Sequence, residues 1–178
     1  GVQYTDKDNK VKYVYQTSWG MTTRIIGALI MVHGDNSGLK MPPKVAPTQV
    51  VIIPVQQKKE GVLEKAAEIA ENLKNAGIRV KLDDSDKTPG FKFAEQEMRG
   101  VPARVEIGPR DIENNMCVVV RRDTGEKIQV SLDNVAEFIK NLMDEIQKNM
   151  FETAAARRDS MTYKAETWEE FTETAKNK

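Results

Sequence analysis

A run of β-branched and apolar residues, TQVVIIPV at 48–55, follows a segment rich in proline and glycine. That segment, GLKMPPKVAP at 38–47, cannot continue a helix or a central strand. A continuous apolar run of this length is typical of a strand buried on both faces of its sheet. The sequence therefore predicts a domain boundary within 38–47 and a buried strand directly after it.

The rest of this region alternates between helical and strand patterns. One helix is expected at 62–77, ended by Gly77, and a short helix at 91–100, ended by Gly100. The inward face of the first helix is predicted to carry Leu63, Ala66, Ile69, Ala70 and Leu73. Further strands are expected at 78–84, 102–108, 116–122 and 127–132, the last two joined by the tight turn DTGE.

A long amphipathic helix is expected over 134–158, where the apolar residues recur with helical spacing. Its inward residues are predicted to be Val135, Phe138, Ile139, Leu142 and Ile146. Strands that alternate with helices and then form a hairpin indicate an α/β fold with a mostly parallel or mixed sheet flanked by helices. Many functions occur on such folds, so particular residues must decide between them.

The N-terminal region has a different pattern. Residues 2–4 and 11–15 predict an antiparallel hairpin, with Val11, Tyr13 and Tyr15 on one side. RIIGALIMVHG predicts a short buried helix that ends at Gly34. His33 is the only histidine and stands beside one carboxylate, Asp35, a pair that by itself makes neither a serine-type triad nor a structural zinc site; we expect His33 to bond the helix C-terminus.

Composition limits the classes of function. The formal net charge is zero, so any RNA recognition must be local and geometric rather than driven by a global basic field. One cysteine, Cys117, excludes an intrachain disulfide and fits a reducing compartment, where we expect it to be packed and non-catalytic. The first residues lack the apolar core of a signal peptide, and IIGALIMV is too short to span a bilayer. A start at Gly1 suggests an internal piece of a longer protein.

The stretch YVYQTSWGMTTRIIGALIMVHGDNSGLKMPPKVAP strongly resembles motif 3 of the prolyl-tRNA synthetases, a family of class II aminoacyl-tRNA synthetases. In that class the motif is a strand that runs into a helix, with an arginine at the junction, here Arg24. The resemblance implies a catalytic contact between Arg24 and ATP, either stacked on the adenine or donating to the γ-phosphate. A planar, permanently charged guanidinium suits both contacts better than a lysine does.

The neighbours of Arg24 complete the ATP and substrate site that the resemblance implies. Ser18, Trp19 and Gly20 border the pocket for proline and its adenylate, and Thr22 places a hydroxyl on the strand face of Arg24. Gly20 also lets the backbone approach a ligand closely. The alternative for Trp19 is ordinary core packing, and for Arg24 a plain surface position.

A second stretch, DDSDKTPGFKFAEQEMRGVPARVEIGPRD, resembles the part of the same family's anticodon-binding domain that reads the anticodon. Proline anticodons share two guanines, whose edges offer acceptors to Lys or Arg and donors to Glu or Asp. Single-stranded bases also stack on aromatic or guanidinium planes. The candidates are Phe91, Lys92, Glu97, Arg99, Arg104 and Arg110, with Lys92, Glu97 and Arg104 first. For each residue alone the alternative is a solvated, salt-bridged side chain.

The resemblance covers nearly the whole chain and implies three parts. Residues 1–46 match the end of the catalytic domain, residues 47–150 the anticodon-binding domain, and residues 151–178 the start of a C-terminal extension found in archaeal- and eukaryotic-type enzymes. Zinc in that extension is not carried over, because its cysteines are missing here. The expected partners are tRNA(Pro), proline and ATP with Mg²⁺, in a cytoplasmic enzyme that is a homodimer.

Two classes of function remain open on the sequence. One is a proline–tRNA ligase, to which these residues supply an ATP contact and anticodon recognition, so that the chain alone should be inactive. The other is a non-enzymatic tRNA-binding module with the same fold. The intact TSWGMTTR segment favours the ligase, since a free-standing module has no use for an adenylate-site motif. An upstream editing domain is neither indicated nor excluded.

Overall fold

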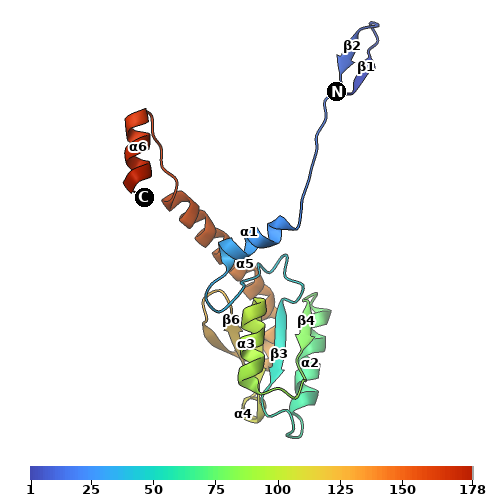
Figure 1. Cartoon of the computed structure of the whole chain (residues 1–178). Helices are drawn as coiled ribbons and strands as arrows, with labels where there is room; N and C mark the ends of the chain where they lie inside the picture. The colour runs from blue at the N-terminus through green and yellow to red at the C-terminus, as the bar shows by residue number, and fades with distance from the viewer. Residues whose placement is uncertain (178) are drawn as a thin grey trace.

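The computed structural model describes residues 1–177, and its centre is a five-stranded mixed sheet in the order β4-β3-β5-β6-β7 (Figure 1). The three parallel strands are β3 (Val50–Pro54), β4 (Val80–Leu82) and β5 (Ala103–Ile107). Antiparallel strands β6 (Met116–Arg121) and β7 (Lys127–Ser131) complete the sheet. This confirms the expected α/β fold, and β3 is the buried strand predicted from TQVVIIPV.

The strand order places the helices on opposite faces. From β3 the chain passes through α2 (Val62–Asn75) to β4 on one side, then returns through α3 (Pro89–Arg99) to β5 on the other. Parallel crossovers are right-handed, so two steps in opposite directions put their helices on opposite faces. Accordingly α3 lies in front of the sheet in Figure 1, while α2 and α5 (Val135–Ser160) pack behind it.

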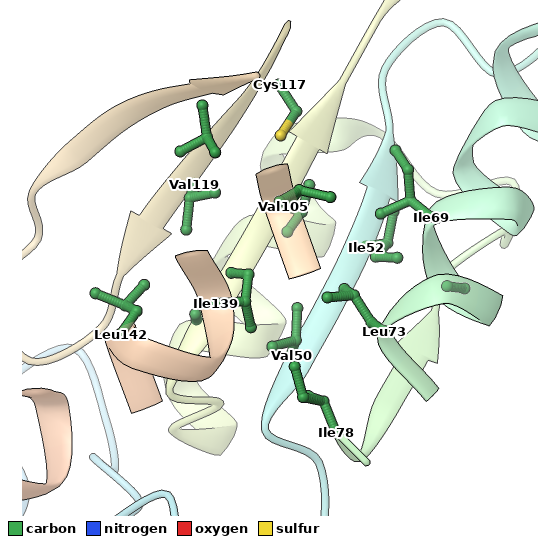
Figure 2. Close-up of a cluster of buried hydrophobic side chains, with 14 of the residues drawn as sticks. Val50, Ile52, Ile69, Leu73, Ile78, Val105, Cys117, Val119, Ile139 and Leu142 are labelled. Carbon is green, nitrogen blue, oxygen red and sulfur yellow. The ribbon is translucent and has the colours of Figure 1, made fainter. Parts of the chain in front are cut away.

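The main core lies between the sheet and the pair α2 and α5. Figure 2 shows Val50 and Ile52 of β3 facing Ile69 and Leu73 of α2, with Ile139 nearby from α5. The alternating residues of β3, Val51 and Ile53, are fully buried on the face that α3 covers. Cys117 also lies in the main core, and burial raises the pKa of its thiol to about 11, so it is a packed, unreactive residue.

Most predicted helix faces are confirmed, with one exception. Leu63 is exposed, and its neighbour Val62 is fully buried in its place, because the first turn of α2 faces the core through position 62. The other four predicted α2 residues are buried, as are four of the five predicted in α5, while Phe138 is partly buried against the core. Gly77 and Gly100 both have the left-handed conformation expected after a helix.

The N-terminal region is arranged differently from the prediction. The hairpin of β1 (Gln3–Thr5) and β2 (Val11–Tyr13) is present, and α1 (Arg24–His33) ends before Gly34 as expected. However, α1 has no buried residue, so its predicted burial is wrong for this chain. No strand forms between β2 and α1, because residues 14–23 have no strand beside them to pair with; Figure 1 shows them as an extended connection.

The C-terminal region is helical. Helix α5 continues without a break from the core to Ser160, and α6 (Trp168–Asn177) follows after a short connection. A short α4 (Pro109–Glu113) and a 3-10 turn, η1 (Leu132–Asn134), complete the elements of the described chain. Among residues 1–177 no helix is both long and apolar enough to cross a membrane.

Gly100 provides a test of how α3 is joined to the segment before β3. A Cβ atom added at Gly100 would lie 2.5 Å from the carbonyl oxygen of Leu39, at a φ of +73°. Gly125 has a similar φ of +77°, but an added Cβ would meet nothing within 4 Å. Gly100→Ala should therefore lower the free energy of unfolding by more than the strain alone, whereas Gly125→Ala should cost only about 1–2 kcal/mol. Urea unfolding of both variants measures this difference; equal losses would contradict it.

Candidate nucleic-acid interface

A cavity of about 350 Å³ lies between the C-terminal end of α3, the start of β5, the β6–β7 turn and residues 35–40. Charged groups of both signs line it, including Glu97, Arg104, Arg121, Arg122 and Lys127. The fold creates this place because α3 lies in front of the sheet (Figure 1), while β6 and β7 continue the sheet beyond β5. The cavity therefore brings together two predicted readout residues, Glu97 and Arg104.

Arg104 is the central side chain of this site. Its guanidinium pairs with the carboxylate of Glu97 through Nη1 and with Glu106 through Nε, the latter at 2.7 Å. It also lies over the ring of Phe93, 4.6 Å from the ring centroid. The guanidinium is thus held flat and oriented, with its side chain 11% exposed and that of Glu97 39% exposed. A fixed guanidinium beside an accessible carboxylate is an arrangement that can meet both edges of a guanine.

The opposite wall of the cavity is a second network of ion pairs. Arg121 donates two hydrogen bonds to the carboxylate of Asp123, at 3.0 and 2.8 Å, and Asn149 of α5 donates a third at 2.7 Å. Burial alone would raise the pKa of Asp123, but the bonds from Arg121 and Asn149 outweigh it and hold the pKa below its usual value. This wall is therefore charged and rigid at neutral pH.

Lys92 does not reach the cavity. Its side chain is 1% exposed beneath α3, where Nζ donates to the main-chain oxygen of Asp83 at 2.8 Å and to Gln57 Oε1 at 3.1 Å. Asp83 is itself buried. Burial raises the pKa of its carboxyl group, but the hydrogen bonds from Ser85 and the charge of Lys92 outweigh burial, so the pKa lies below its usual value. In this structure Lys92 joins α3 to the ends of β3 and β4, and it borders a different cavity from that of Glu97 and Arg104.

The other predicted readout residues lie apart from Glu97 and Arg104. Phe91 is exposed at the start of α3, under the ammonium group of Lys87 at 4.5 Å. Arg99 is exposed and pairs with Glu95 at 2.7 Å. Arg110 lies at the far end of the sheet, beside the carboxyl end of β5, where it lines another cavity with Lys59. The six predicted residues are thus spread over both ends of α3.

The carboxyl ends of the parallel strands carry a second group of cations. Lys58, Lys59 and Lys87 line a further cavity that Lys92 also borders. Lys65 lies farther along the chain on α2, where it forms an ion pair with Glu68. Of these lysines, Lys58 and Lys59 are exposed in a position where a phosphate could approach them.

The predicted ATP-site residues lie in solvent. Trp19 is 94% exposed, so core packing within this chain is excluded for it, and Ser18, Gly20 and Arg24 are also exposed. Arg24 is the first residue of α1, and its main-chain N–H donates to Thr22 Oγ1 at 3.4 Å. The strand face that was to hold Thr22 and Arg24 is absent, because no partner strand lies beside residues 14–23 among the described residues. His33 is half-buried, and burial lowers its pKa.

Sequence reasoning missed several residues of the cavity, namely Asp35, Lys40, Arg121, Arg122 and Asp123. Arg121 and Arg122 lie at the end of the strand predicted at 116–122, and the strand pattern alone does not indicate that they line a cavity. Asp35 could not be placed, since its partner Arg122 is 87 residues away. Within residues 1–177 no group of three or more His, Cys, Asp or Glu side chains could hold a metal ion.

Comparison with known proteins agrees with this geometry. Residues 49–142, more than half of the chain, match the family model described as "Anticodon binding domain". The chain therefore belongs to the family of anticodon-binding domains. The match begins one residue before β3 and ends within α5, so it covers the sheet and the residues Glu97 and Arg104.

The similar proteins are proline–tRNA ligases. The enzyme of Lachnospira eligens is 65% identical over all 178 residues, and that of Lachnoclostridium phytofermentans 63% over 177 residues. The prolyl-tRNA synthetase of Cryptosporidium parvum, crystallised with L-proline and AMP, superposes with a TM-score of 0.89 and 41% identity over 97% of this chain. The chain spans 37% of the length of each of the two ligases and 38% of the crystallised chain. The resemblance found in the sequence is thereby confirmed.

The position of Lys92 can be tested against Lys87, which is exposed and near it in sequence. Lys92→Met keeps the apolar stem but leaves the carbonyl of Asp83 and the side chain of Gln57 without their buried donor, so it should lower the free energy of unfolding by about 1–3 kcal/mol. Lys87→Met removes an exposed ion pair and should change it by less than about 0.5 kcal/mol. Denaturant unfolding measures the free energy of unfolding of both variants. A Lys92→Met variant that is as stable as wild type but binds RNA more weakly would contradict the structural role.

Proposed function

We propose that this chain recognises the anticodon of tRNA(Pro) as part of a longer proline–tRNA ligase, to which it also supplies an ATP contact. The observation that carries the proposal is the pair Glu97 and Arg104, held at a cavity inside the segment that matches the anticodon-binding family. The similar ligases and the crystallised synthetase support the reaction: activation of proline with ATP, then transfer to tRNA.

Glu97 and Arg104 suit the two edges of a guanine. The guanidinium of Arg104 can donate to O6 and N7, and the carboxylate of Glu97 can accept from N1–H and N2–H₂. In the structure without a ligand, Arg104 donates a hydrogen bond to the carboxylate of Glu97. This bond must break, or the two side chains must also bond the base, when a base enters. A base that lacks one of these two edges leaves either Glu97 or Arg104 unpaired in a half-buried site. The free-energy cost of that unpaired charge makes the site selective for guanine.

The remaining predicted residues take supporting roles in this proposal. Exposed Phe91 offers a ring on which a loop base can stack, while Arg99 and Arg110 offer charge to the sugar–phosphate chain. Lys92 is assigned to holding α3 in place, because its ammonium group is enclosed by Asp83 and Gln57. Readout of bases is thus concentrated at the C-terminal end of α3.

In the longer enzyme, Arg24 is proposed to contact ATP, which is consumed as its Mg²⁺ complex. Ser18, Trp19, Gly20 and Thr22 are proposed to border the adenylate and proline pocket, once the exposed connection 14–23 gains a strand beside it. A positioned guanidinium stabilises the charge that develops on phosphate oxygens during adenylate formation. Residues outside this chain are needed to complete that site.

Several broader features of the enzyme are also proposals. We place it in the cytoplasm, consistent with a single, reduced cysteine and a tRNA substrate, and as a homodimer by resemblance to the family. A non-enzymatic tRNA-binding module is the competing function. The identity to the ligase of Lachnospira eligens extends over residues 1–46 as well as the anticodon-binding domain, which favours the ligase.

Base readout can be tested with Glu97→Gln and Arg104→Lys against Glu95→Gln, a carboxylate two residues away that pairs with Arg99 and Lys87. The measurement is binding of anticodon hairpins with each guanine kept or replaced. Each lost base-edge contact should cost about 1–3 kcal/mol for the correct hairpin and narrow its advantage over the altered ones. Glu95→Gln should leave that advantage unchanged. An advantage as wide as wild type in both test variants would place the readout elsewhere.

The ATP contact can be tested with Arg24→Ala in the longer enzyme. Removal of a charged donor set should slow proline-dependent ATP–pyrophosphate exchange by about 10²-fold or more, while anticodon-hairpin binding stays unchanged. Arg158→Ala, an exposed arginine of α5, serves as the matched control. The isolated chain should show no exchange, since Trp19 and Arg24 face solvent in it. Unchanged exchange in Arg24→Ala would show that another residue holds ATP.

A further inference from the structure

Residues 34–41, here called the strap, connect α1 to the anticodon-binding domain and lie along the end of α3. The main-chain N–H of Leu39 donates to Met98 O at 3.1 Å, and that of Met41 donates to Gly100 O at 3.0 Å. A Cβ atom added at Gly38 would lie 2.5 Å from Met98 Cα. The strap and the last turn of α3 are therefore packed backbone against backbone, with no side chain between them.

A forked ion pair holds the strap on its other side. Arg122 donates to both carboxylate oxygens of Asp35, at 2.9 and 2.6 Å, and Lys40 approaches the same carboxylate at 3.1 Å. Side-chain hydrogen bonds from Arg122 hold the pKa of Asp35 far below its usual value, so the pair is charged throughout the neutral range. Bidentate geometry fixes both position and orientation of the two groups.

Arg122 also contacts the readout residue Glu97. Its Nε donates to the main-chain oxygen of Glu97 at 3.0 Å, while the carboxylate of Glu97 pairs with Arg104. The guanidinium of Arg122 therefore bonds two places at once: Asp35, which lies just beyond the end of α1, and the last turn of α3. The side chain of Arg122 is only 9% exposed while that of Asp35 is 37% exposed, so the bond to Glu97 is better shielded from water than the ion pair is.

We propose that Asp35 and Arg122 are positioning residues that couple anticodon occupancy to the orientation of α1, the helix that begins at Arg24. The proposal rests on the proposed function of the two ends. When a base edge opens the Glu97–Arg104 pair, the last turn of α3 adjusts, and the strap transmits this adjustment through the Leu39, Met41 and Arg122 contacts to Gly34 and α1. The bistable element is the Glu97–Arg104 pair, either closed on itself or open to a base.

Coupling between two binding sites is reciprocal, and this gives a direct measurement. In the longer enzyme, the affinity for an anticodon hairpin is measured with and without a saturating, non-hydrolysable prolyl-adenylate analogue. The ratio of the two dissociation constants is the coupling factor, which is typically about 5- to 150-fold for linked sites. Wild type should give a factor of about 5 or more.

Asp35→Asn should bring the coupling factor to within about 2-fold of one; because the factor is a ratio of two dissociation constants, it is separate from any change in the affinity for either ligand alone. Glu152→Gln, which removes an exposed carboxylate paired with Lys148 on α5, should keep the wild-type factor. A purely structural role for Asp35 would lower the unfolding temperature and leave the factor unchanged, and that result would overturn the proposal. Arg122→Lys, which keeps the charge but loses the Nε–H bond to Glu97, should also abolish coupling and replaces Asp35→Asn if that variant does not fold.

The outcomes separate this proposal from the proposed function. If wild type binds neither the hairpin nor the analogue, the proposed function is wrong. If wild type binds both with a coupling factor of one, anticodon and adenylate recognition stand and the positioning role of Asp35 and Arg122 is overturned. If the factor is large in wild type and lost in Asp35→Asn and Arg122→Lys alone, the coupling is carried by the strap.

Discussion

The complete burial of β3 on both of its faces is the constraint on which the rest of the structure depends. Val50 and Ile52 are covered by α2 and α5, while Val51 and Ile53 are covered by α3. A strand buried on both sides needs a helix on each face, and the right-handed crossovers to β4 and β5 supply them. The position of α3 over the sheet follows from this requirement. Glu97 meets Arg104 because α3 must end above the start of β5.

Local patterns predicted the elements, while long-range contacts decided the site. Helix faces, strand positions and the glycines that end α2 and α3 follow from periodicity over a few residues, and these predictions are confirmed. The predicted burial of Leu63 is wrong, because apolar character alone does not show which of two adjacent residues in the first turn of a helix faces inward. The buried position of Lys92 was not predicted, because its partners Asp83 and Gln57 lie 9 and 35 residues away in the sequence. No pattern within a short window encodes such an enclosure.

Under the proposed function, the electrostatics of the cavity account for selective binding of an anionic polymer by a chain with zero net charge. Most charged groups on its walls have a partner of opposite sign in the structure, from Arg104 with Glu97 to Arg121 with Asp123. Such a site attracts phosphate only weakly, because most of its cations are already neutralised. Such a site favours a ligand whose donors and acceptors can replace those partners in the same positions, as the two edges of a guanine can. Selectivity then arises from the exchange of partners rather than from bulk attraction.

The same arrangement explains why the N-terminal region can be placed by the anticodon-binding domain without being packed into it. Residues 1–40 include no buried residue, so hydrophobic burial within this chain does not determine where α1 points. Its direction is set by contact with α5 and by the strap, where glycine at positions 38 and 100 permits backbone contact and Arg122 holds Asp35. Hydrogen bonds and a forked ion pair are directional, whereas apolar packing is not. In the proposed coupling, a joint made of directional contacts transmits a small shift of α3 to α1, while apolar side chains such as Trp19 remain exposed in the described chain.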